Sequence, residues 1–488
     1  MSRNAIVIAS WGFPPQWRRA KYRLHLVDRG YNIDFSCETC CSTVALAAAL
    51  NLKESVNLCK VVVIGADSVL SPENFGDGVS FRKGVKNAFK GFVQALLRKE
   101  NCACCESLSP DVFDVFIIPG IGKYYGYQFN GTIEQIFVSV FYRVLAVLRE
   151  VKKADIFLDI THGINYQVVA SLYATIAAIL SFDPTLEGRL FIVNSEPYPP
   201  GYRSKICITA QRPPLFEGAP ILGIQNFSAL HNVIRIIRAL SGLYFLNEQP
   251  LSRILALIKE KELNAYFKDL VIFFRFLRLG LAGLLYPNSN SPYSAKEINE
   301  KILKFYEATR KEIFGEENID ENVKALDEKL FIPEIDHSRK NITYPPAKTY
   351  CVIVENLEQI RKNIIQELAE KTTLKDFLSS LLKVYENKGL IDKKHIIERE
   401  RDSFMNIIEK LKNISKEKIW TQKLIALAWS AIKGIPFIEE KIGKFDLRTL
   451  FAHAGLSHTI IKQIKIHNNE EYIHFDEKQI EKIIKRIK

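Results

Sequence analysis

The sequence predicts an α/β domain followed by an all-α region, and three observations lead to this prediction. The chain has 488 residues, a length that favours two or three domains over a single core. Over roughly the first 210 residues, short apolar runs alternate with longer segments of helical spacing. From about Leu222 onward, nearly every segment has helical spacing. Strand, loop and helix in repetition predict a mostly parallel sheet with helices on both faces, and the second half predicts a helical domain.

Five apolar runs in the first half have the composition of strands that are buried on both faces of a sheet. They are Ala5–Ala9, Lys60–Ile64, Asp114–Ile118, Asp155–Ile160 and Arg189–Val193. Two alternating segments flank Asp28-Arg29-Gly30 and predict a hairpin of Lys21–Val27 with Tyr31–Ser36. Helical spacing lies between the strands at Cys41–Leu50, Ser80–Lys99, Thr132–Lys152 and Tyr166–Leu180.

The second half predicts a series of helices, interrupted by proline, glycine and asparagine clusters. The helical segments are His231–Tyr244, Leu251–Lys261, Ala265–Leu285, Lys296–Phe314, Val354–Leu368, Leu374–Asn387, Lys393–Leu411 and Lys418–Gly434. A short terminal hairpin would pair Ile461–Ile466 with Glu471–His474. We therefore expect a sheet domain at residues 1–212, a helical linker at 213–350 and a second helical domain at 351–488.

The composition is that of a globular protein, because 47% of the residues are hydrophobic and 25% are charged. These values argue against disorder, collagen or a coiled coil for the whole chain. The net charge of +12 is divided as +5 over residues 1–212, +1 over 213–400 and +6 over 401–488. Two basic regions around a neutral middle are compatible with polyanionic partners, such as nucleic acid or an acidic membrane, but identify neither.

No segment has the pattern of a signal peptide or a membrane span. The apolar run Ala5–Ala9 is too short for a signal-peptide core, and Pro14 and Pro15 follow it. The stretch Val168–Leu180 is too short to cross a bilayer and contains Ser171. We expect a soluble protein in the cytoplasm that does not act at a membrane.

Seven of the nine cysteines lie before residue 106, and six of these form two clusters. The clusters are Cys37, Cys40, Cys41 and Cys102, Cys104, Cys105. Two C-x-x-C pairs, Cys37/Cys40 and Cys102/Cys105, are compatible with a four-thiolate zinc site. The glycine turns common in such sites are missing, which favours a disulfide that joins the two segments, or buried reduced thiols. The sequence leaves the three alternatives open.

Polar or glycine-rich loops follow four of the predicted strands. They are Ser10-Trp11-Gly12, Gly65-Ala66-Asp67, Gly120-Ile121-Gly122-Lys123 and the run from Asp159 to Tyr166. Ligands of parallel sheets bind beyond the carboxyl ends of the strands, so these loops predict a ligand site. A nicotinamide cofactor is disfavoured because no G-x-G-x-x-G follows the first strand, and no phosphate-binding P-loop sequence is present.

The string Leu158–Tyr166 (LDITHGINY), together with Ser10-Trp11-Gly12, resembles the CARF domain of CRISPR-associated proteins. The Thr-His-Gly-Ile-Asn run is similar to that of the CARF–HEPN ribonucleases of type III CRISPR systems. The resemblance covers about residues 1–210 and implies a Rossmann-like sensor domain. It also implies a cyclic oligoadenylate as ligand, bound across the two-fold axis of a homodimer, with cyclic tetra-adenylate as the commoner ring size.

The resemblance assigns ligand-binding roles to three groups of residues. Ser10, Trp11 and Gly12 would line the first loop, and Thr161, His162, Gly163 and Asn165 the last. A looser match places Gly122, Tyr124, Tyr127 and Gln128 in a loop that closes over the ligand. Adenines require stacking and amide hydrogen bonds, and a ring of phosphates requires backbone amides and cations. His162 by itself is more typical of a histidine that orders its loop.

The basic C-terminal region contains an R-x4-H motif formed by Arg448 and His453, in a predicted helix that Asp446 caps. The spacing alone is a weak signal, and Arg18 and Arg19 before His25 form a similar pair in the sheet domain. The string resembles the catalytic motif of HEPN ribonucleases, although Thr449 stands where that family often has Asn. Five helical residues turn by about 500°, so the two side chains point about 140° apart. A dimer that brings two such helices together would form a composite site.

The resemblance implies a metal-independent endoribonuclease that cleaves single-stranded RNA in type III CRISPR antiviral defence. It implies no cofactor and no catalytic metal, with a cyclic oligoadenylate as allosteric activator. The protein would be a homodimer or a higher homo-oligomer, such as a trimer of dimers, with residues 213–350 packed in the dimer. Two alternatives remain: a ligand-responsive transcription regulator with a CARF sensor, and a ring nuclease that degrades its own cyclic oligoadenylate.

Overall fold

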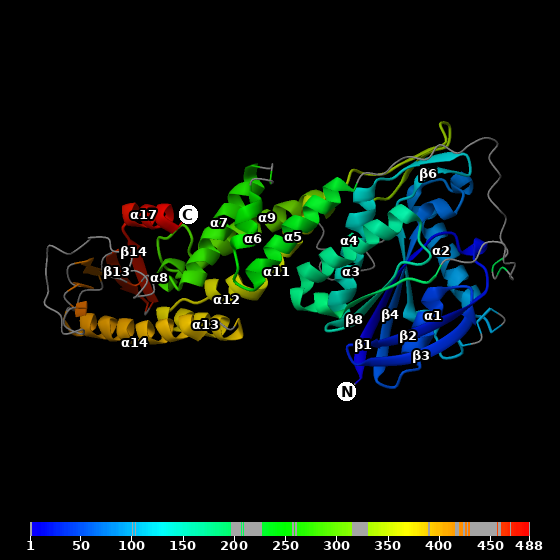
Figure 1. Cartoon of the computed structure of the whole chain (residues 1–488). Coiled ribbons are helices and arrows are strands. Elements are labelled where there is room, and N and C mark those ends of the chain that lie inside the picture. The colour runs from blue at the N-terminus through cyan, green and yellow to red at the C-terminus, as the bar shows by residue number, and fades with distance from the viewer. Residues whose placement is uncertain are drawn as a thin grey trace. The chain divides into compact units, whose positions relative to one another are not determined.

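The structure is a computed structural model of the whole chain (Figure 1). It describes residues 2–99, 101–102, 104–196, 206, 208, 227–255, 258, 261–314, 330–388, 391–414, 419–422, 425–426, 428–429, 456, 460–468 and 470–487. Two compact units divide the chain. Unit 1 consists of Met1–Arg235 and Arg310–Ile353, and unit 2 of Ile236–Thr309 and Val354–Lys488.

A parallel five-stranded sheet forms the centre of unit 1 and confirms the predicted fold class. Its strands are β1 (Arg3–Trp11), β4 (Val56–Ala66), β5 (Phe113–Ile118), β8 (Asp155–Asp159) and β9 (Leu190–Val193). The order is β5-β4-β1-β8-β9, and every neighbouring pair is parallel. Residues Ala5 to Ala9 of β1 are at most 1% exposed. This burial explains why β1 is a continuous apolar run, since both faces of a central parallel strand are covered.

Helices cover both faces of this sheet (Figure 1). They are α1 (Ser42–Asn51), α2 (Gly78–Leu97), α3 (Ile133–Val151) and α4 (Asn165–Phe182). Alternate residues of β1, among them Ala5, Val7 and Ala9, share one core with α1 and α2. Helices α3 and α4 pack against each other and contact β5 and β1. Thr132 and Gln135 form a capping box that fixes the start of α3.

The predicted hairpin is present as β2 (Ala20–Asp28) and β3 (Tyr31–Thr39), which pair antiparallel. Gly30 has a φ of +85°, a conformation that glycine adopts without strain, and this allows the tight turn. The hairpin lies beside α1 and contributes Tyr31, Ile33 and Cys37 to the core that contains α1 and α2.

A second sheet corrects the expectation that residues 122–128 form a closing loop. β6 (Ile121–Tyr124) and β7 (Tyr127–Asn130) form a hairpin, and β7 pairs with β11 (Asn341–Thr343). β11 in turn pairs with β10 (Glu334–Asp336). The units of the structure therefore differ from the three predicted ranges, because residues 330–350 lie within unit 1. Pairing between segments so far apart along the chain leaves no local signal.

Unit 2 consists mainly of helices, as predicted. They include α6 (Gln249–Ile254), α7 (Lys261–Leu279), α8 (Ala282–Leu285), α13 (Leu374–Asn387), α14 (Ile391–Ile414) and α17 (Glu477–Ile487). Helix α11 (Tyr350–Ile360) continues through a π-helical turn (Arg361–Ile365) into α12 (Gln366–Ala369). Three helices, α5 (Ser228–Tyr244), α9 (Ala295–Phe314) and α11, each have residues in both units. Most of the predicted helices therefore have a counterpart in the structure.

The predicted C-terminal hairpin is present as β13 (Ile461–His467) and β14 (Glu470–Phe475). The start of the predicted helix Lys418–Gly434 is wrong, because β12 (Ile419–Thr421) adds a third strand to this hairpin. Ile, Trp and Thr all favour strands, and pairing with β13 decides the conformation. Helix α17 after the hairpin was not predicted.

Helix α4 is long and apolar enough to cross a membrane, judged by length and composition among the described residues. In the structure it is a core helix of unit 1, packed on α3. Ala170, Ala174, Ala177 and Ala178 are fully buried. These small side chains allow α4 to pack closely on its neighbours in unit 1.

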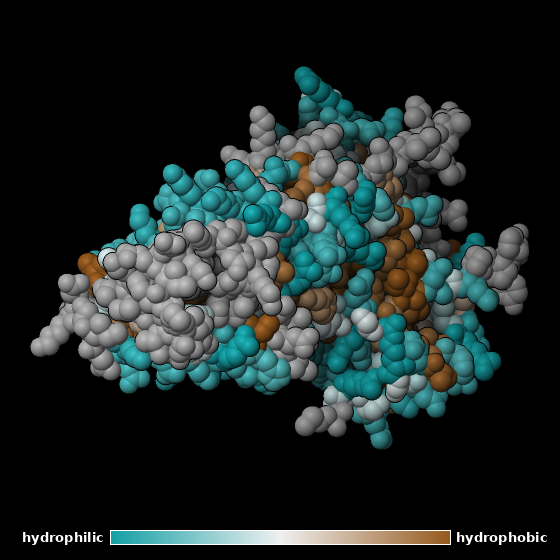
Figure 2. All heavy atoms as spheres, turned by 60° about the vertical axis from the view of Figure 1, so that its left-hand side comes forward, coloured by the Kyte–Doolittle hydropathy of each residue, from teal (hydrophilic) through white to brown (hydrophobic). Residues whose placement is uncertain are grey.

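The described surface in the view of Figure 2 is mostly polar, with separate apolar patches. Large apolar side chains that are more than half exposed include Val27 of β2, Val79 of α2 and Ile192 of β9.

A candidate ligand site at the carboxyl edge of the sheet

The carboxyl ends of β1, β4, β5 and β8 meet at one edge of the parallel sheet, so the four predicted loops lie at that edge. Hydrogen bonds from backbone N–H groups join them in pairs. The N–H of Gly12, after β1, donates to the carbonyl of His162, after β8, at 2.8 Å. The N–H of Gly120, after β5, donates to Oδ1 of Asp67, after β4, also at 2.8 Å. At this edge the loops are therefore hydrogen-bonded to one another in two pairs.

Two glycines permit the close approach of the first and last loops. A Cβ atom on Gly12 would lie 2.9 Å from the carbonyl oxygen of His162. A Cβ atom on Gly163 would lie 2.4 Å from Cγ2 of Val168 and 2.8 Å from Cβ of Ser10. Such distances are shorter than carbon atoms tolerate, so any larger residue would separate the loops. The predicted residues Gly12 and Gly163 are therefore needed to form the edge.

The side chains of Ser10 and Trp11 are buried within unit 1. Ser10 Oγ donates to Ser171 Oγ of α4 at 2.9 Å. Trp11 is fully buried, and its Nε1 donates to Thr43 Oγ1 of α1 at 3.0 Å. Both side chains hold the end of β1 between two helices. Their direct contact with a ligand stays a prediction, and in this structure their polar groups bind within the domain.

His162 is held by aromatic and backbone groups. Its ring stacks on Trp17 with centroids 4.3 Å apart, and Tyr22 Oη lies 3.3 Å from its Nε2. The backbone N–H of Ser42, at the start of α1, donates to Nε2 at 3.0 Å. This bond requires Nε2 to be unprotonated, and burial lowers the pKa of His162 by disfavouring the charged ring. The neutral imidazole therefore orders the loop, which is the role that the sequence favoured for His162 by itself.

Asp159 is a central residue of the edge that the sequence analysis did not single out. Its buried carboxylate accepts hydrogen bonds from Ser42 Oγ and Thr43 Oγ1, both at 2.7 Å. It also accepts from the N–H of Thr161 at 3.0 Å. Thr161 Oγ1 in turn accepts from the N–H of Ser195, which follows β9. The sequence signal that could have identified Asp159 as an acceptor at this edge is its position, since it is an acidic residue at the end of a buried apolar strand.

The N-terminus of α4 opens at the same edge. The N-cap residue Ile164 provides no side-chain hydrogen bond to the first turn. Asn165 at the first position is exposed, whereas Gln167 is fully buried and donates from Nε2 to the carbonyl of Ile64 at 2.7 Å. Unpaired amides and the positive end of a helix dipole favour an anion at such a position. Asn165 and Gln128 are the predicted ligand residues whose side chains are exposed.

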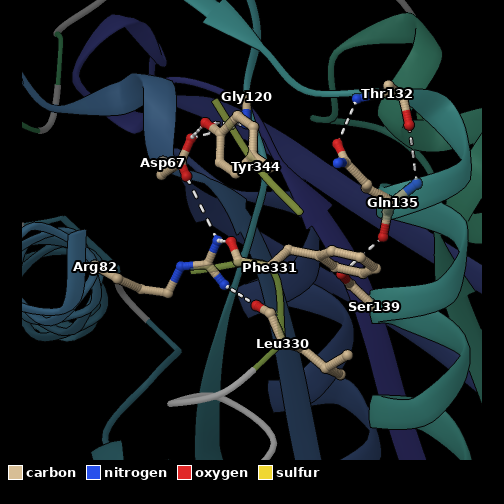
Figure 3. A network of polar contacts seen from close by, with 9 residues as sticks. All are labelled: Asp67, Arg82, Gly120, Thr132, Gln135, Ser139, Leu330, Phe331 and Tyr344. Carbon is tan, nitrogen blue, oxygen red and sulfur yellow. Dashed lines mark hydrogen bonds and ion pairs between the residues drawn. The ribbon is translucent and has the colours of Figure 1, made fainter. Parts of the chain in front are cut away.

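The loops after β4 and β5 are fastened by a buried polar network (Figure 3). The Asp67 carboxylate accepts from Gly120 N–H and from Tyr344 Oη, at 2.8 and 2.9 Å, and lies 3.6 Å from the Arg82 guanidinium. Arg82 also donates to the carbonyls of Leu330 and Phe331, at 2.7 and 2.8 Å. Burial raises the pKa of Asp67 to about 6, although Arg82 and the hydrogen bonds lower it.

The hairpin β6–β7 reaches the edge through α4. Tyr166 Oη donates to the carbonyl of Ile121 at 3.4 Å. Of the predicted residues, Gly122 has a φ of +116°, and Gln128 is exposed, with its N–H bonded to the carbonyl of Lys340. Tyr127 is buried and its Oη lies 2.9 Å from Nδ1 of His337. Tyr127 thus binds the segment at 337, and the hairpin is part of a sheet.

The predicted catalytic residues Arg448 and His453 lie outside the described residues, as does Asp446. Their roles therefore stay predictions. In the described part of unit 2, β12, β13 and β14 form one sheet. In the sequence, residues 422–460 lie between β12 and β13.

The class of domain follows from the geometry: an open parallel sheet with helices on both faces is a Rossmann-like α/β domain, a fold whose ligands bind beyond the carboxyl ends of the strands. Residues 6–197 match the family model of the CRISPR system endoribonuclease Csx1, CARF domain. The chain is also 24% identical over 487 residues to the CRISPR system endoribonuclease Csx1 of Methanocaldococcus jannaschii, with 97% of this chain and 90% of that protein covered. These matches confirm the resemblance to CRISPR-associated CARF ribonucleases.

A structural comparison finds Enterococcus italicus Csm6 bound to cyclic hexa-2'-fluoro-hexa-dAMP. It covers 89% of this chain and 93% of that chain, with 12% identity and a TM-score of 0.24.

Proposed function

We propose that this protein is an endoribonuclease of type III CRISPR defence that a cyclic oligoadenylate activates. The observation that carries the proposal is the match of residues 6–197, which form the sheet and its loop edge, to the CARF domain of an endoribonuclease. The identity to Csx1 extends over 97% of the chain and so includes the helical half. Unit 1 is the sensor in this proposal, and unit 2 contains the ribonuclease.

The loop edge has the groups that a cyclic oligoadenylate requires. The first amides of α4 can accept phosphate oxygens, and the glycines at 12 and 163 let the loops of this edge approach each other closely. Asn165 offers an exposed amide for an adenine edge. The predicted ligand set remains Ser10, Trp11, Gly12, Gly122, Tyr127, Gln128, Thr161, His162, Gly163 and Asn165. Cyclic tetra-adenylate is the ring size that we propose to test first.

The ligand is a symmetric ring, and we propose that it binds across the axis of a homodimer. Helix α4 supports a dimer because Val169, Leu172, Tyr173 and Ile176 lie on one face at helical spacing and are only partly buried. A second copy of this face would cover the stripe and bring the two N-termini of α4 into one site. A higher homo-oligomer built from such dimers is compatible with the same contact.

We propose that Arg448 and His453 cleave RNA without a metal ion. His453 acts on a proton, either removing it from the 2′-hydroxyl or donating it to the leaving 5′ oxygen. The 2′ oxygen forms a bond to phosphorus as the bond to the 5′ oxygen breaks. Arg448 stabilises the added negative charge on the phosphate. Because the two side chains diverge on one predicted helix, a composite site from two protomers supplies both groups.

The decisive experiment measures cleavage of single-stranded RNA in EDTA, with and without cyclic tetra-adenylate or cyclic hexa-adenylate. We expect strong stimulation by one of the two rings. An absence of stimulation by both would contradict the proposal. Binding of either ring to the intact protein, measured in parallel by calorimetry, separates failure of the sensor from failure of the nuclease.

The two alternative functions give different results with the same protein. A ligand-responsive transcription regulator would keep its function in the double variant Arg448→Ala, His453→Ala, whereas the proposed ribonuclease would lose cleavage and still bind the ring. A ring nuclease would degrade labelled cyclic tetra-adenylate even as the His453→Ala variant. Persistence of intact ligand in that incubation would exclude this activity at the loop edge.

A further inference from the structure

Four cysteine sulfur atoms meet in unit 1, and none of the four residues belongs to the proposed ligand set. Cys37 lies on β3, and Cys102, Cys104 and Cys105 lie between α2 and β5. All four Sγ atoms lie within 4.8 Å of one another. Cys37, Cys102 and Cys105 are at most 3% exposed, and Cys104 is partly buried. The structure pairs them as two disulfides, Cys37–Cys104 and Cys102–Cys105.

The cluster has the size of a zinc tetrathiolate. Zinc–sulfur bonds of about 2.3 Å in a tetrahedron place the sulfur atoms about 3.8 Å apart. Two separations between sulfurs that are not bonded to each other match this edge. Cys37 Sγ lies 3.8 Å from Cys102 Sγ, and Cys102 Sγ lies 3.6 Å from Cys104 Sγ. Small movements of the side chains therefore convert the cluster into four ligands around one ion.

The segment that carries three of the cysteines is held by hydrogen bonds that do not involve sulfur. The buried side chain of Asn101 donates from Nδ2 to the carbonyl of Ala95 at 2.9 Å. The N–H of Cys102 donates to the carbonyl of Arg98 at 3.0 Å, and the N–H of Leu108 to the carbonyl of Cys105 at 2.9 Å. The backbone therefore keeps the thiols together after the disulfides are reduced, which lowers the cost of metal binding.

We propose that the reduced protein binds one Zn²⁺ through Cys37, Cys102, Cys104 and Cys105. A thiol reductant supplies four electrons, and four protons are taken up, when the two disulfides become four thiols. Zinc then binds four thiolates and releases four protons, which leaves a centre of net charge −2. Soft thiolates in a tetrahedral set select zinc over magnesium or calcium. All four positions are filled by protein, so the site is structural and supplies no catalytic group.

The metal would support the proposed ligand edge through the hairpin. Cys37 is paired directly with Tyr22 across β2 and β3, and Tyr22 Oη lies 3.3 Å from Nε2 of His162. A metal at Cys37 fastens β3 to the segment at 102–105 and thereby fixes the strand that carries Tyr22. The inference itself does not depend on the proposed ribonuclease activity, because its test measures metal and thiols only.

The test uses the full chain, reduced by a phosphine under anaerobic conditions and titrated with Co²⁺ and then Zn²⁺. We expect one Co²⁺ per chain with the visible bands and the thiolate charge-transfer absorption of a tetrahedral sulfur site, lost when Zn²⁺ displaces cobalt. Cys37→Ser and Cys104→Ser should each lose the tetrathiolate spectrum. Cys59→Ser is the matched control, because Cys59 is a free, partly buried cysteine of unit 1 outside the cluster.

Thiol mapping keeps the inference testable if the serine variants do not fold. Wild-type protein is alkylated with Zn²⁺ or with a chelator, and the modified cysteines are identified by mass spectrometry of peptides. Zinc should protect Cys37, Cys102, Cys104 and Cys105 while leaving the labelling of Cys59 unchanged. The inference is overturned if the reduced protein takes up no metal, if it takes up only iron, or if protection falls on other cysteines.

Discussion

The backbone N–H of Gly12 donates a hydrogen bond of 2.8 Å to the carbonyl oxygen of His162. This bond joins the loops that follow two neighbouring strands, β1 and β8, which pair in parallel. The candidate ligand edge of unit 1 therefore depends on how closely two backbones approach. Four predictions follow from this edge, from the polar network beside it and from the C-terminal motif.

Replacing Gly12 should weaken activation by the cyclic oligoadenylate. In Gly12→Ala the new Cβ would lie 2.9 Å from the carbonyl oxygen of His162, and overpacking of this kind costs about 1–3 kcal/mol. The loops would separate, and ligand affinity measured by calorimetry should fall about tenfold or more. Gly91→Ala in α2 is the control, since a Cβ there meets no atom within 4 Å. Unchanged affinity in Gly12→Ala would show that the ligand binds elsewhere.

Replacing His162 by Phe should remove a pH dependence of stability. Burial lowers the pKa of His162 below its usual 6.5 in the folded state. The unfolded chain therefore binds the proton first, and the contribution to stability that exists above pH 6.5 is lost as the pH falls. Phe retains the stack on Trp17 but gives Ser42 no acceptor, which costs about 1–3 kcal/mol.

Denaturant unfolding at several values between pH 5 and about pH 8 measures this effect. The wild type should lose stability relative to His162→Phe as the pH is lowered through this range. His25→Phe, on the exposed face of β2, controls for the introduction of a phenylalanine. A constant difference in stability between wild type and variant at every pH would contradict the assignment of a neutral, partly buried His162.

Replacing Asp67 by Asn should remove a pH dependence of stability whose sign is opposite to that of His162. The pKa of Asp67 is raised from 3.8 to about 6 in the folded state, so the folded protein holds the proton over a range in which the unfolded chain has lost it. The contribution is complete below about pH 4 and is lost as the pH rises through about 6. Relative to Asp67→Asn, the wild type should lose up to about 3 kcal/mol over this range.

Unfolding curves of the two proteins at pH 4, 5, 6 and about 7 give the comparison. Asn still accepts from the N–H of Gly120, so the variant should keep the fold. Glu73→Gln, an exposed site near the same loop, should show no such shift against the wild type. If the wild type instead became more stable relative to Asp67→Asn as the pH rises, the ion pair with Arg82 would outweigh burial in setting the pKa of Asp67.

Replacing Arg448 or His453 by Ala should abolish RNA cleavage and leave activator binding intact. Loss of a general acid or base typically costs 10²–10⁴-fold in rate, and loss of a charge-stabilising group has a similar effect (about 10²–10³-fold). Cleavage of labelled RNA by saturating protein measures the rate, and calorimetry measures the binding. His25→Ala removes the histidine that follows Arg18 and Arg19 at R-x6-H and R-x5-H spacing in the sheet domain, and this variant should retain full cleavage. Full activity in His453→Ala would reject the motif.

Local pattern was sufficient for the elements that a single stretch of chain defines. The five apolar runs became the five parallel strands, and the turn at Gly30 became a hairpin, because burial on both faces and a positive φ leave signatures within a few residues. The convergence of the loops at one edge also follows from parallel topology. The hairpin at 121–130 was expected as a loop because its partner strand, β11, lies far along the chain.

The candidate site shows the same division. The glycines at 12 and 163 were recognisable from the string around them, and their tight contacts explain the choice of glycine. The burial of Ser10 and Trp11, and the network of Asp67 with Arg82 and Tyr344, were not foreseen. Side-chain orientation at a strand end depends on which helix packs there, and no local period encodes it. The roles of Arg448 and His453 stay predictions.

The sequence alone determined the class of fold, the position of the loops and the identification of the R-x4-H motif. Spacing of apolar residues sets secondary structure, and parallel strands bring their carboxyl ends to one edge. The folded chain added the contacts between distant segments: Gly12 with His162, Asp67 with Tyr344, and Cys37 with the cysteines at 102, 104 and 105. Such contacts arise from packing in three dimensions, where residues distant in sequence share one core and no local signal records the meeting.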